Sequence, residues 1–282
     1  SPYWVSYWEQ LGVFGVVPEK WEIVENGPLR WVYRVSGSVG NSKFKQDIVM
    51  RKGERSIGFD LELDCACDEG YFAVEFPADP GTCLFADIPF GVEERDLSKE
   101  PYGSLPDSPI NYNGLERGKD GMFFAKSWAS FQSGEMPAAI VSENCSIYYH
   151  YDAAHHAVSL ILNRSMPLEN KRERWFNQTH PNIDGSGVHR YQYHLLFPEE
   201  ISRFADIGKF AKGKALPLHS AAKFNYSTGD GLQLDKSFVD IDGGNVIVTA
   251  FYKEDGNYIL RFYEAEGRSS QVGVTADFPF NR

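Results

Sequence analysis

Apolar and polar side chains alternate at residues 56–64, which read Ser-Ile-Gly-Phe-Asp-Leu-Glu-Leu-Asp. Successive side chains of a β-strand point to opposite faces, so this segment predicts a strand with one apolar face and one acidic face. Similar alternation recurs at 29–35. With 26 Gly and 15 Pro scattered along the chain, we predict many short strands joined by turns.

The segment 245–267 reads as a β-hairpin. Its second arm covers residues 258–263, and Asp255-Gly256 between the arms supplies a residue that can adopt positive φ, as a tight hairpin turn requires. Alternation along the first arm predicts four residues on one face: Val246, Val248, Ala250 and Tyr252.

Further strands are expected along most of the chain, namely at 21–25, 29–35, 43–51, 71–76, 84–89, 89–95, 121–128, 138–141, 146–151, 157–162, 191–197, 238–241 and 271–276. One helix is predicted from Pro198 to about Ala211, because acidic residues open it and lysines close it. A long loop is predicted at 98–118. The predicted organisation is a connecting segment at 1–20, a large β-domain at 21–198, a helix and linker at 199–220, and a small β-domain at 221–282.

The charge pattern argues against nucleic-acid binding. The formal net charge is −11, and no stripe of Lys and Arg offers a path for a phosphate backbone. No apolar run reaches the ~20 residues of a membrane helix. A signal peptide is not evident at the start, although the natural N-terminus is expected to lie upstream of Ser1.

The four cysteines do not predict a metal site. Cys65 and Cys67 form a Cys-x-Cys pair without the second ligand pair of a zinc ribbon, and Cys83 and Cys145 are isolated. We expect free thiols in a cytoplasmic protein, because a reducing compartment disfavours disulfides.

Four motifs carry a resemblance. They are Ile-Pro-Phe-Gly-Val-x-x-Arg at 88–95, Leu-Ile-Leu-Asn-Arg-Ser at 160–165, Asp-Gly-x-Gly-x-His-x-Tyr-x-Tyr-x-Leu at 184–195, and Leu-Arg-Phe-Tyr-Glu-x-x-Gly at 260–267. Together they resemble the C-terminal β-region of family 38 glycoside hydrolases, the α-mannosidases. The resemblance covers nearly all of this chain but only the C-terminal part of such an enzyme.

The resemblance implies an all-β fold: a large antiparallel β-supersandwich of the galactose-mutarotase type, then a short helix and linker, then a small β-sandwich. It also implies a retaining glycosidase with an aspartate nucleophile, a second carboxylate and a zinc ion bound by Asp and His. In the family those groups lie on an N-terminal α/β barrel, and no α/β stretch is evident here. We therefore expect no catalytic residue and no metal or other cofactor in this chain, with zinc in the catalytic domain outside it.

Three residues are candidates for substrate binding. Asp184 and His189 flank a Gly-rich turn, where the backbone can approach a sugar closely; the alternative is a structural turn that caps the histidine. Arg164 ends a strand before a loop, so it is either a sugar or interdomain contact or a member of an ion pair at the rim.

The other candidates have simpler alternatives. His155 and His156 at a hairpin tip are either solvated or able to capture a metal. Three aromatic residues either stack on sugars or belong to the core: Trp128, Trp175 and Phe176. Arg261 and Glu264 are expected to hold the small domain against the large one.

Three functions remain open on this sequence. The first is the non-barrel part of an α-mannosidase, with a mannose-containing oligosaccharide and its own N-terminal barrel as partners and with homo-oligomers as an option. The second is a free-standing carbohydrate-binding module. The third is an enzyme of the aldose-epimerase type, which needs a His acid and a carboxylate base such as His189 with Glu75 or Asp184.

Overall fold

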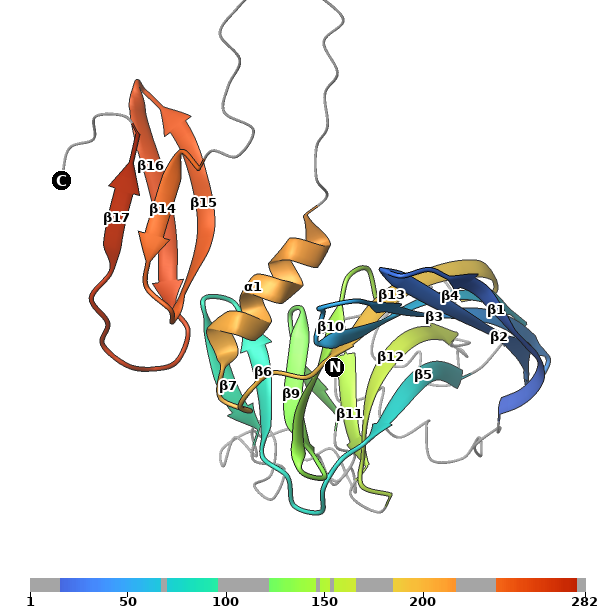
Figure 1. Ribbon diagram of the computed structural model, residues 1–282. Coiled ribbons are helices and arrows are strands. Elements are labelled where there is room, and N and C mark those ends of the chain that lie inside the picture. Colours follow the sequence, from blue (N-terminus) through green and yellow to red (C-terminus); the bar gives the residue numbers. More distant parts are fainter. Residues whose placement is uncertain are drawn as a thin grey trace, which may run out of the picture.

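The computed structural model describes residues 16–66, 70–95, 122–145, 148–152, 155–165, 185–216 and 237–277. Two large antiparallel sheets lie face to face, one helix packs outside them, and a small β unit follows the helix (Figure 1). The predicted all-β fold with one short helix is therefore confirmed. Within these ranges, no helix is both long enough and apolar enough to cross a membrane.

The larger sheet has nine strands. In spatial order they are β1 (Val16–Asn26), β2 (Arg30–Val39), β3 (Ser42–Arg51), β4 (Ser56–Cys65), β13 (Gly187–Leu196), β10 (Met136–Ser142), β9 (Trp128–Ser133), β6 (Leu84–Ile88) and β7 (Gly91–Arg95). Every pairing in it is antiparallel. The alternating segment of the sequence is β4, near the middle of this sheet.

The smaller sheet has four strands, in the order β5 (Gly70–Pro77), β12 (Ala157–Ser165), β11 (Tyr148–Asp152) and β8 (Met122–Phe124). The space between the two sheets is filled by apolar side chains from both. Leu84 and Ile140 of the larger sheet and Tyr149 and Leu160 of the smaller one are all 0% exposed. This shared core explains why the alternating strands stack as a sandwich.

One predicted strand, at 121–128, is wrong as a single element. Its residues divide between β8 and β9, which belong to different sheets. Asp87 of β6 holds the corner, because its carbonyl accepts the Lys126 N–H at 2.7 Å and its carboxylate accepts the Ser127 hydroxyl. Burial raises the pKa of Asp87, although the bond from Ser127 acts in the opposite direction.

The helix α1 (Phe204–Ala215) begins later than the sequence predicts. The carbonyls of Glu200 and Ser202 accept the N–H groups of Arg203 and Phe204 in short turns, so regular helix starts only at Phe204. One face of α1 packs on the outer side of β9 and β10, where Trp128 is 1% exposed. A second apolar core therefore lies on the far side of the larger sheet.

The small unit consists of two antiparallel pairs. One is the hairpin of β15 (Val246–Glu254) and β16 (Asn257–Glu264), and the other joins β14 (Val239–Asp242) to the more distant β17 (Gly273–Ala276). The predicted turn is confirmed, because Asp255 and Gly256 both have positive φ, 48° and 82°. A bulge at Thr249 shifts the register, so the predicted common face of the first arm is interrupted.

The small unit is attached through α1. Ile247 of β15 is buried in the second core, and it faces Gly208, where an added Cβ would lie 2.4 Å from the Ile247 Cδ1 atom. Lys209 donates to the Gly244 carbonyl at 3.0 Å, and the Tyr263 ring meets Phe90 of the large domain edge-on, with 6.2 Å between centroids. The helix is thus the main mechanical link between the two β units.

Candidate functional site

A junction at Gly185 joins the two sheets at one end of the sandwich. Its N–H donates to the Ser165 hydroxyl at 3.0 Å, and its carbonyl accepts the Asn163 side-chain amide at 2.7 Å. A Cβ at this position would lie 2.4 Å from Asn163 Oδ1 and 2.6 Å from the Arg164 carbonyl oxygen. Only glycine fits here, because any side chain would collide with the end of β12.

His189 on β13 belongs to the same junction. Its Nε2 lies 2.9 Å from the Gly185 carbonyl oxygen and 3.1 Å from that of Ser186, so this nitrogen carries the proton and donates to both. Its ring stacks on Tyr191, with 6.2 Å between centroids. The arrangement matches the structural alternative for His189, a histidine that caps a Gly-rich turn.

Arg164 lies beside this junction but points away from it. Asn163 and Ser165 face the junction, so alternation along β12 directs Arg164 to the outer face of the four-stranded sheet. Its guanidinium lies 5.6 Å from the centroid of the Tyr148 ring, and Tyr148 in turn contacts the half-exposed ring of Phe124 with 4.6 Å between centroids. Arg164, Tyr148 and Phe124 form what we call the outer aromatic face.

The structure describes two of the three predicted substrate-binding residues. Arg164 and His189 lie at the same end of the sandwich, on opposite sides of β12, and Asp184 lies outside the described residues. Sequence reasoning missed Asn163, Ser165 and Gly185 as the group that fixes this end. These three residues belong to the Asn-Arg-Ser and Asp-Gly motifs of the sequence. The charged residues of those motifs, Arg164 and Asp184, drew attention away from them.

The histidines near the hairpin tip of β11 do not assemble a metal site. His150 and Asp152 have the His-x-Asp spacing, but the Asp152 carboxylate lies 2.6 Å from Nδ1 of His155, whose side chain is 80% exposed. The hydrogen bond that the His155 ring donates to the Asp152 carboxylate raises the pKa of His155. Within the described ranges, no three His, Cys, Asp or Glu side chains gather closely enough to hold a metal ion, so a zinc site does not fit these residues.

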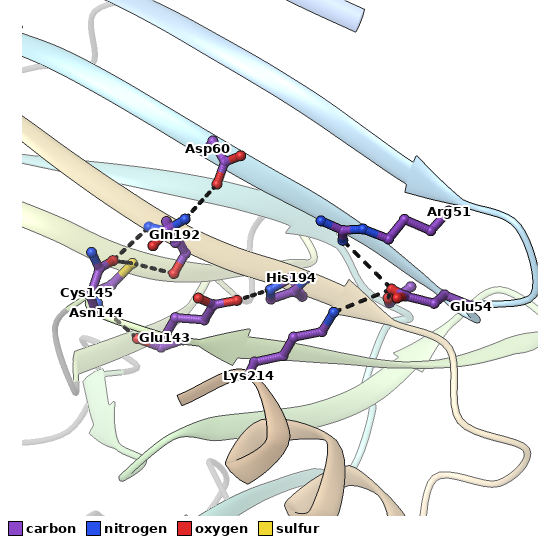
Figure 2. A network of polar contacts seen from close by, with 11 residues as sticks. Arg51, Glu54, Asp60, Glu143, Asn144, Cys145, Gln192, His194 and Lys214 are labelled. Atoms are coloured by element: carbon purple, nitrogen blue, oxygen red, sulfur yellow. Dashed lines mark hydrogen bonds and ion pairs between the residues drawn. The ribbon is translucent and has the colours of Figure 1, made fainter. Parts of the chain in front are cut away.

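A second polar cluster lies under α1, on the outer side of the larger sheet (Figure 2). The buried His194 places its Nε2 against the Glu143 carboxylate, and its ring meets Phe210 of α1 edge-on, with 5.5 Å between centroids. Lys214 of α1 reaches Glu54 at 3.3 Å. Figure 2 also shows a neighbouring set of contacts that involves Asp60, Asn144, Cys145 and Gln192.

The His194–Glu143 pair has the composition of a general acid–base dyad but not the access. The His194 side chain is 7% exposed and its Nδ1 is buried. Gly58 is the partner of His194 on the adjacent strand β4, and a Cβ there would lie only 3.2 Å from this nitrogen, so no space for a sugar remains on that side of the ring. The pair instead helps to hold α1 on the sheet.

The His189–Glu75 pair of an epimerase-type enzyme is not assembled either, while the other predicted base, Asp184, lies outside the described residues. Phe76 and Val74 pack against the core between the sheets, so Glu75 between them points to the outer face of β5, where it meets Ser159 at 3.5 Å. His189 belongs to the other sheet and its Nε2 is engaged by backbone carbonyls. The two groups therefore do not face a common substrate position.

The remaining candidates that the structure describes have structural roles. Trp128 belongs to the core, while Trp175 and Phe176 lie outside the described residues. The Glu264 carboxylate accepts bonds from the Asn245 amide and from the N–H groups of Glu266 and Arg268 at 2.7–3.0 Å.

The Arg261 guanidinium lies 5.4 Å from the centroid of the Tyr252 ring. Both Arg261 and Glu264 thus brace the small unit internally, and the neighbouring Tyr263 makes the contact with the large domain.

No protein-family model matches the sequence, and no curated protein matches it. Two solved structures from Enterococcus faecalis share its fold. An alpha-mannosidase of strain V583 aligns with a TM-score of 0.70 at 12% identity, over 93% of this chain and 31% of its own. A protein in the Glycosyl Hydrolase Family 38 aligns with a TM-score of 0.68 at 12% identity, over 93% of this chain and 32% of its own.

The sequence resemblance to family 38 is thus confirmed at the level of the fold. The chain spans about a third of the length of the solved structures that it matches, and it has the fold of that third.

Proposed function

We propose that this chain is the C-terminal, non-barrel part of an α-mannosidase of family 38. The observation that supports this proposal is the match of 93% of the chain to about a third of an alpha-mannosidase. On this proposal the β-sandwich forms a wall of the active-site cleft, and the nucleophile and zinc ligands belong to a barrel outside it. The complete protein would act on a mannose-containing oligosaccharide in the cytoplasm.

The construction of the sandwich end supports a binding role for Arg164. The Gly185 junction fixes the end of β12, so Arg164 projects from a rigid strand rather than from a loop. A guanidinium has five N–H donors in a planar fork, and such a fork suits the hydroxyl groups of a sugar. We assign Arg164 as the residue of this chain that contacts the sugar or the barrel, with His189 as a positioning residue.

The test compares the isolated chain with the full-length polypeptide on an aryl α-mannoside, with and without a metal chelator. Chelator-sensitive turnover is expected for the full-length protein, and no turnover for the isolated chain. Arg164→Ala in the full-length protein should lower kcat/KM by about tenfold to a hundredfold, the equivalent of one or two charged hydrogen bonds. Comparable turnover by the isolated chain would overturn the proposal.

A free-standing carbohydrate-binding module is the second candidate, and the outer aromatic face favours it. Phe124 is 52% exposed beside Tyr148 and Arg164, and sugars bind on exposed aromatic rings. Calorimetry of the isolated chain with mannose oligosaccharides tests this candidate. Binding heat that disappears in Phe124→Ala supports the module, and no heat with the wild-type chain counts against it.

A further inference from the structure

The apolar face of the nine-stranded sheet continues beyond the strands that the smaller sheet covers. One row of directly paired residues crosses five strands, in the order Tyr193, Phe59, Ile48, Tyr33 and Ile23. Residues paired in this way share a face. Exposure rises along the row from 1% at Tyr193 to 69% at Ile23.

Apolar residues of neighbouring rows on the same face are also exposed. Trp21 on β1 is 64% exposed, Trp31 on β2 is 36% exposed and Met50 on β3 is 42% exposed. We call the apolar residues of this face on β1 to β3 the inner apolar surface; its members are Trp21, Ile23, Trp31, Tyr33, Val35, Ile48 and Met50. Soluble proteins seldom leave a contiguous patch of such side chains open to water.

The opposite face of the same three strands is mainly charged, although it also holds the buried Val32 and Val49. Arg34 bonds Asp47 at 2.6 Å, and Lys45 reaches Glu62 of β4 at 3.0 Å. Lys20 and Glu22 pair at 2.7 Å on the edge strand. The two faces of these strands therefore differ. The charged face is suited to contact with water, and the inner apolar surface is suited to burial against another part of the protein.

We propose that the inner apolar surface is the docking surface for the remaining part of the full-length α-mannosidase. This inference rests on the function proposed above. The two chains that share the fold are about three times as long as the aligned region, which occupies 31% and 32% of them. A polypeptide of that size has to pack against the sandwich somewhere, and a large exposed apolar patch marks an interaction site.

A second copy of the chain fits this surface less well. The edge strand β1 carries register shifts between Pro18 and Lys20 and between Ile23 and Glu25, which disrupt the ladder that another strand would extend. In Figure 1, β1 to β3 curve beyond the four-stranded sheet. The inner apolar surface continues the face of β4 and β13 that packs against the smaller sheet, so it lies on the side of the curve that faces that sheet. If two copies of the chain met through this surface, two concave faces would touch only at their rims. A separate domain with a convex surface can instead fill the concave face.

Hydrogen exchange tests the proposal by comparing β1 to β3 in the full-length protein and in the isolated chain. Exchange in these strands should be at least about tenfold slower in the full-length protein. The double variant Trp21→Ser with Trp31→Ser should restore fast exchange in the full-length protein while leaving the isolated chain folded. Glu22→Ser, on the charged face, and Phe262→Ser, an exposed aromatic of the small unit, are matched controls that should change nothing.

Three outcomes decide the matter. Equal exchange in both proteins overturns the docking surface even if the full-length protein hydrolyses an aryl α-mannoside. Sedimentation that shows a dimer of the isolated chain, abolished by Trp21→Ser, overturns it in favour of a second copy. Slow exchange in a full-length protein without mannosidase activity supports the docking surface and removes only the proposed activity.

Discussion

Two regions of the same sheet have the same sequence pattern and opposite surroundings. In β4 and β13 the apolar face lies under the four-stranded sheet, and Leu63 and Tyr193 are 2% and 1% exposed. In β1 and β2 the same face lies open, and Trp21 and Ile23 are 64% and 69% exposed. Alternation thus establishes which face of a strand is apolar. Whether that face is buried depends on segments far away in the chain or outside it.

The sharpest test of this contrast compares Tyr193→Ala with Trp21→Ala in the isolated chain. Tyr193 stacks on Phe59 with 4.9 Å between centroids and accepts a bond from Gln46. Its truncation leaves a cavity and should lower the free energy of unfolding by about 3–5 kcal/mol. Trp21→Ala should cost less than about 0.5 kcal/mol, because the ring is exposed.

Urea or guanidinium unfolding of both variants measures the difference. Similar losses for the two would show that the inner apolar surface is buried in the isolated chain, and the contrast would then be broken.

The junction at Gly185 gives the next largest effect. Gly185→Ala should cost about 2 kcal/mol, because the added Cβ meets Asn163 Oδ1 and the Arg164 carbonyl oxygen. Gly213→Ala in α1 is the matched control, since nothing lies within 4 Å of its added Cβ. That change should stabilise the chain by about 0.5–1 kcal/mol through helix propensity. A harmless Gly185→Ala would mean that the two sheets are not held together at this end.

The buried pair under α1 extends the contrast to the outer side of the sheet. Glu143→Ala should cost about 1–2 kcal/mol, because it leaves the buried Nε2 of His194 without its acceptor. Glu54→Ala removes a more exposed carboxylate of the same cluster and should cost less than about 1 kcal/mol. Equal effects in denaturant unfolding would indicate that water reaches both carboxylates.

The smallest effect concerns the small unit. Burial raises the pKa of Glu264, but bonds from the N–H groups of Glu266 and Arg268 and from the Asn245 amide outweigh it and lower the pKa below 4.5. A lowered folded-state pKa stabilises the protein above the ordinary glutamate range, and this contribution is lost as the pH falls through the folded-state pKa. Glu264→Gln should therefore cost about 1 kcal/mol at pH 7 and less at pH 3.

Thermal unfolding of the wild type and Glu264→Gln at both pH values measures this difference. A gap between the two proteins that widens in acid would mean that the Glu264 carboxylate does not favour its ionised form in the folded state.

Much of the fold could be predicted from local pattern. The alternation of β4 and the Asp255-Gly256 turn both appear in the structure as the sequence indicates. The split of 121–128 could not be predicted, because the corner is held by Asp87, about forty residues earlier in the chain. The late start of α1 likewise depends on turns that compete with helix for the same carbonyls.

The candidate site was predictable only in part. Charged residues such as Arg164 stand out at a strand end, so the sequence directs attention to this end of the sandwich. The bonds among Asn163, Ser165 and Gly185 join residues about twenty positions apart, and no local pattern announces them. The Glu143–His194 pair was missed for the same reason, because its members face one another only after β10 and β13 have paired.

The contact between Gly208 and Ile247 has a consequence for how such chains can diverge. The Ile247 Cδ1 methyl group occupies the space on the helix surface that the missing side chain of Gly208 leaves. A Cβ at position 208 would lie 2.4 Å from that methyl group. A larger residue at 208 would be accommodated where the Ile247 side chain turned aside or, more completely, where residue 247 became smaller. Substitutions at these two positions should therefore arise in compensating pairs among related sequences, and the angle at which the small unit leans on the helix should follow their combined size.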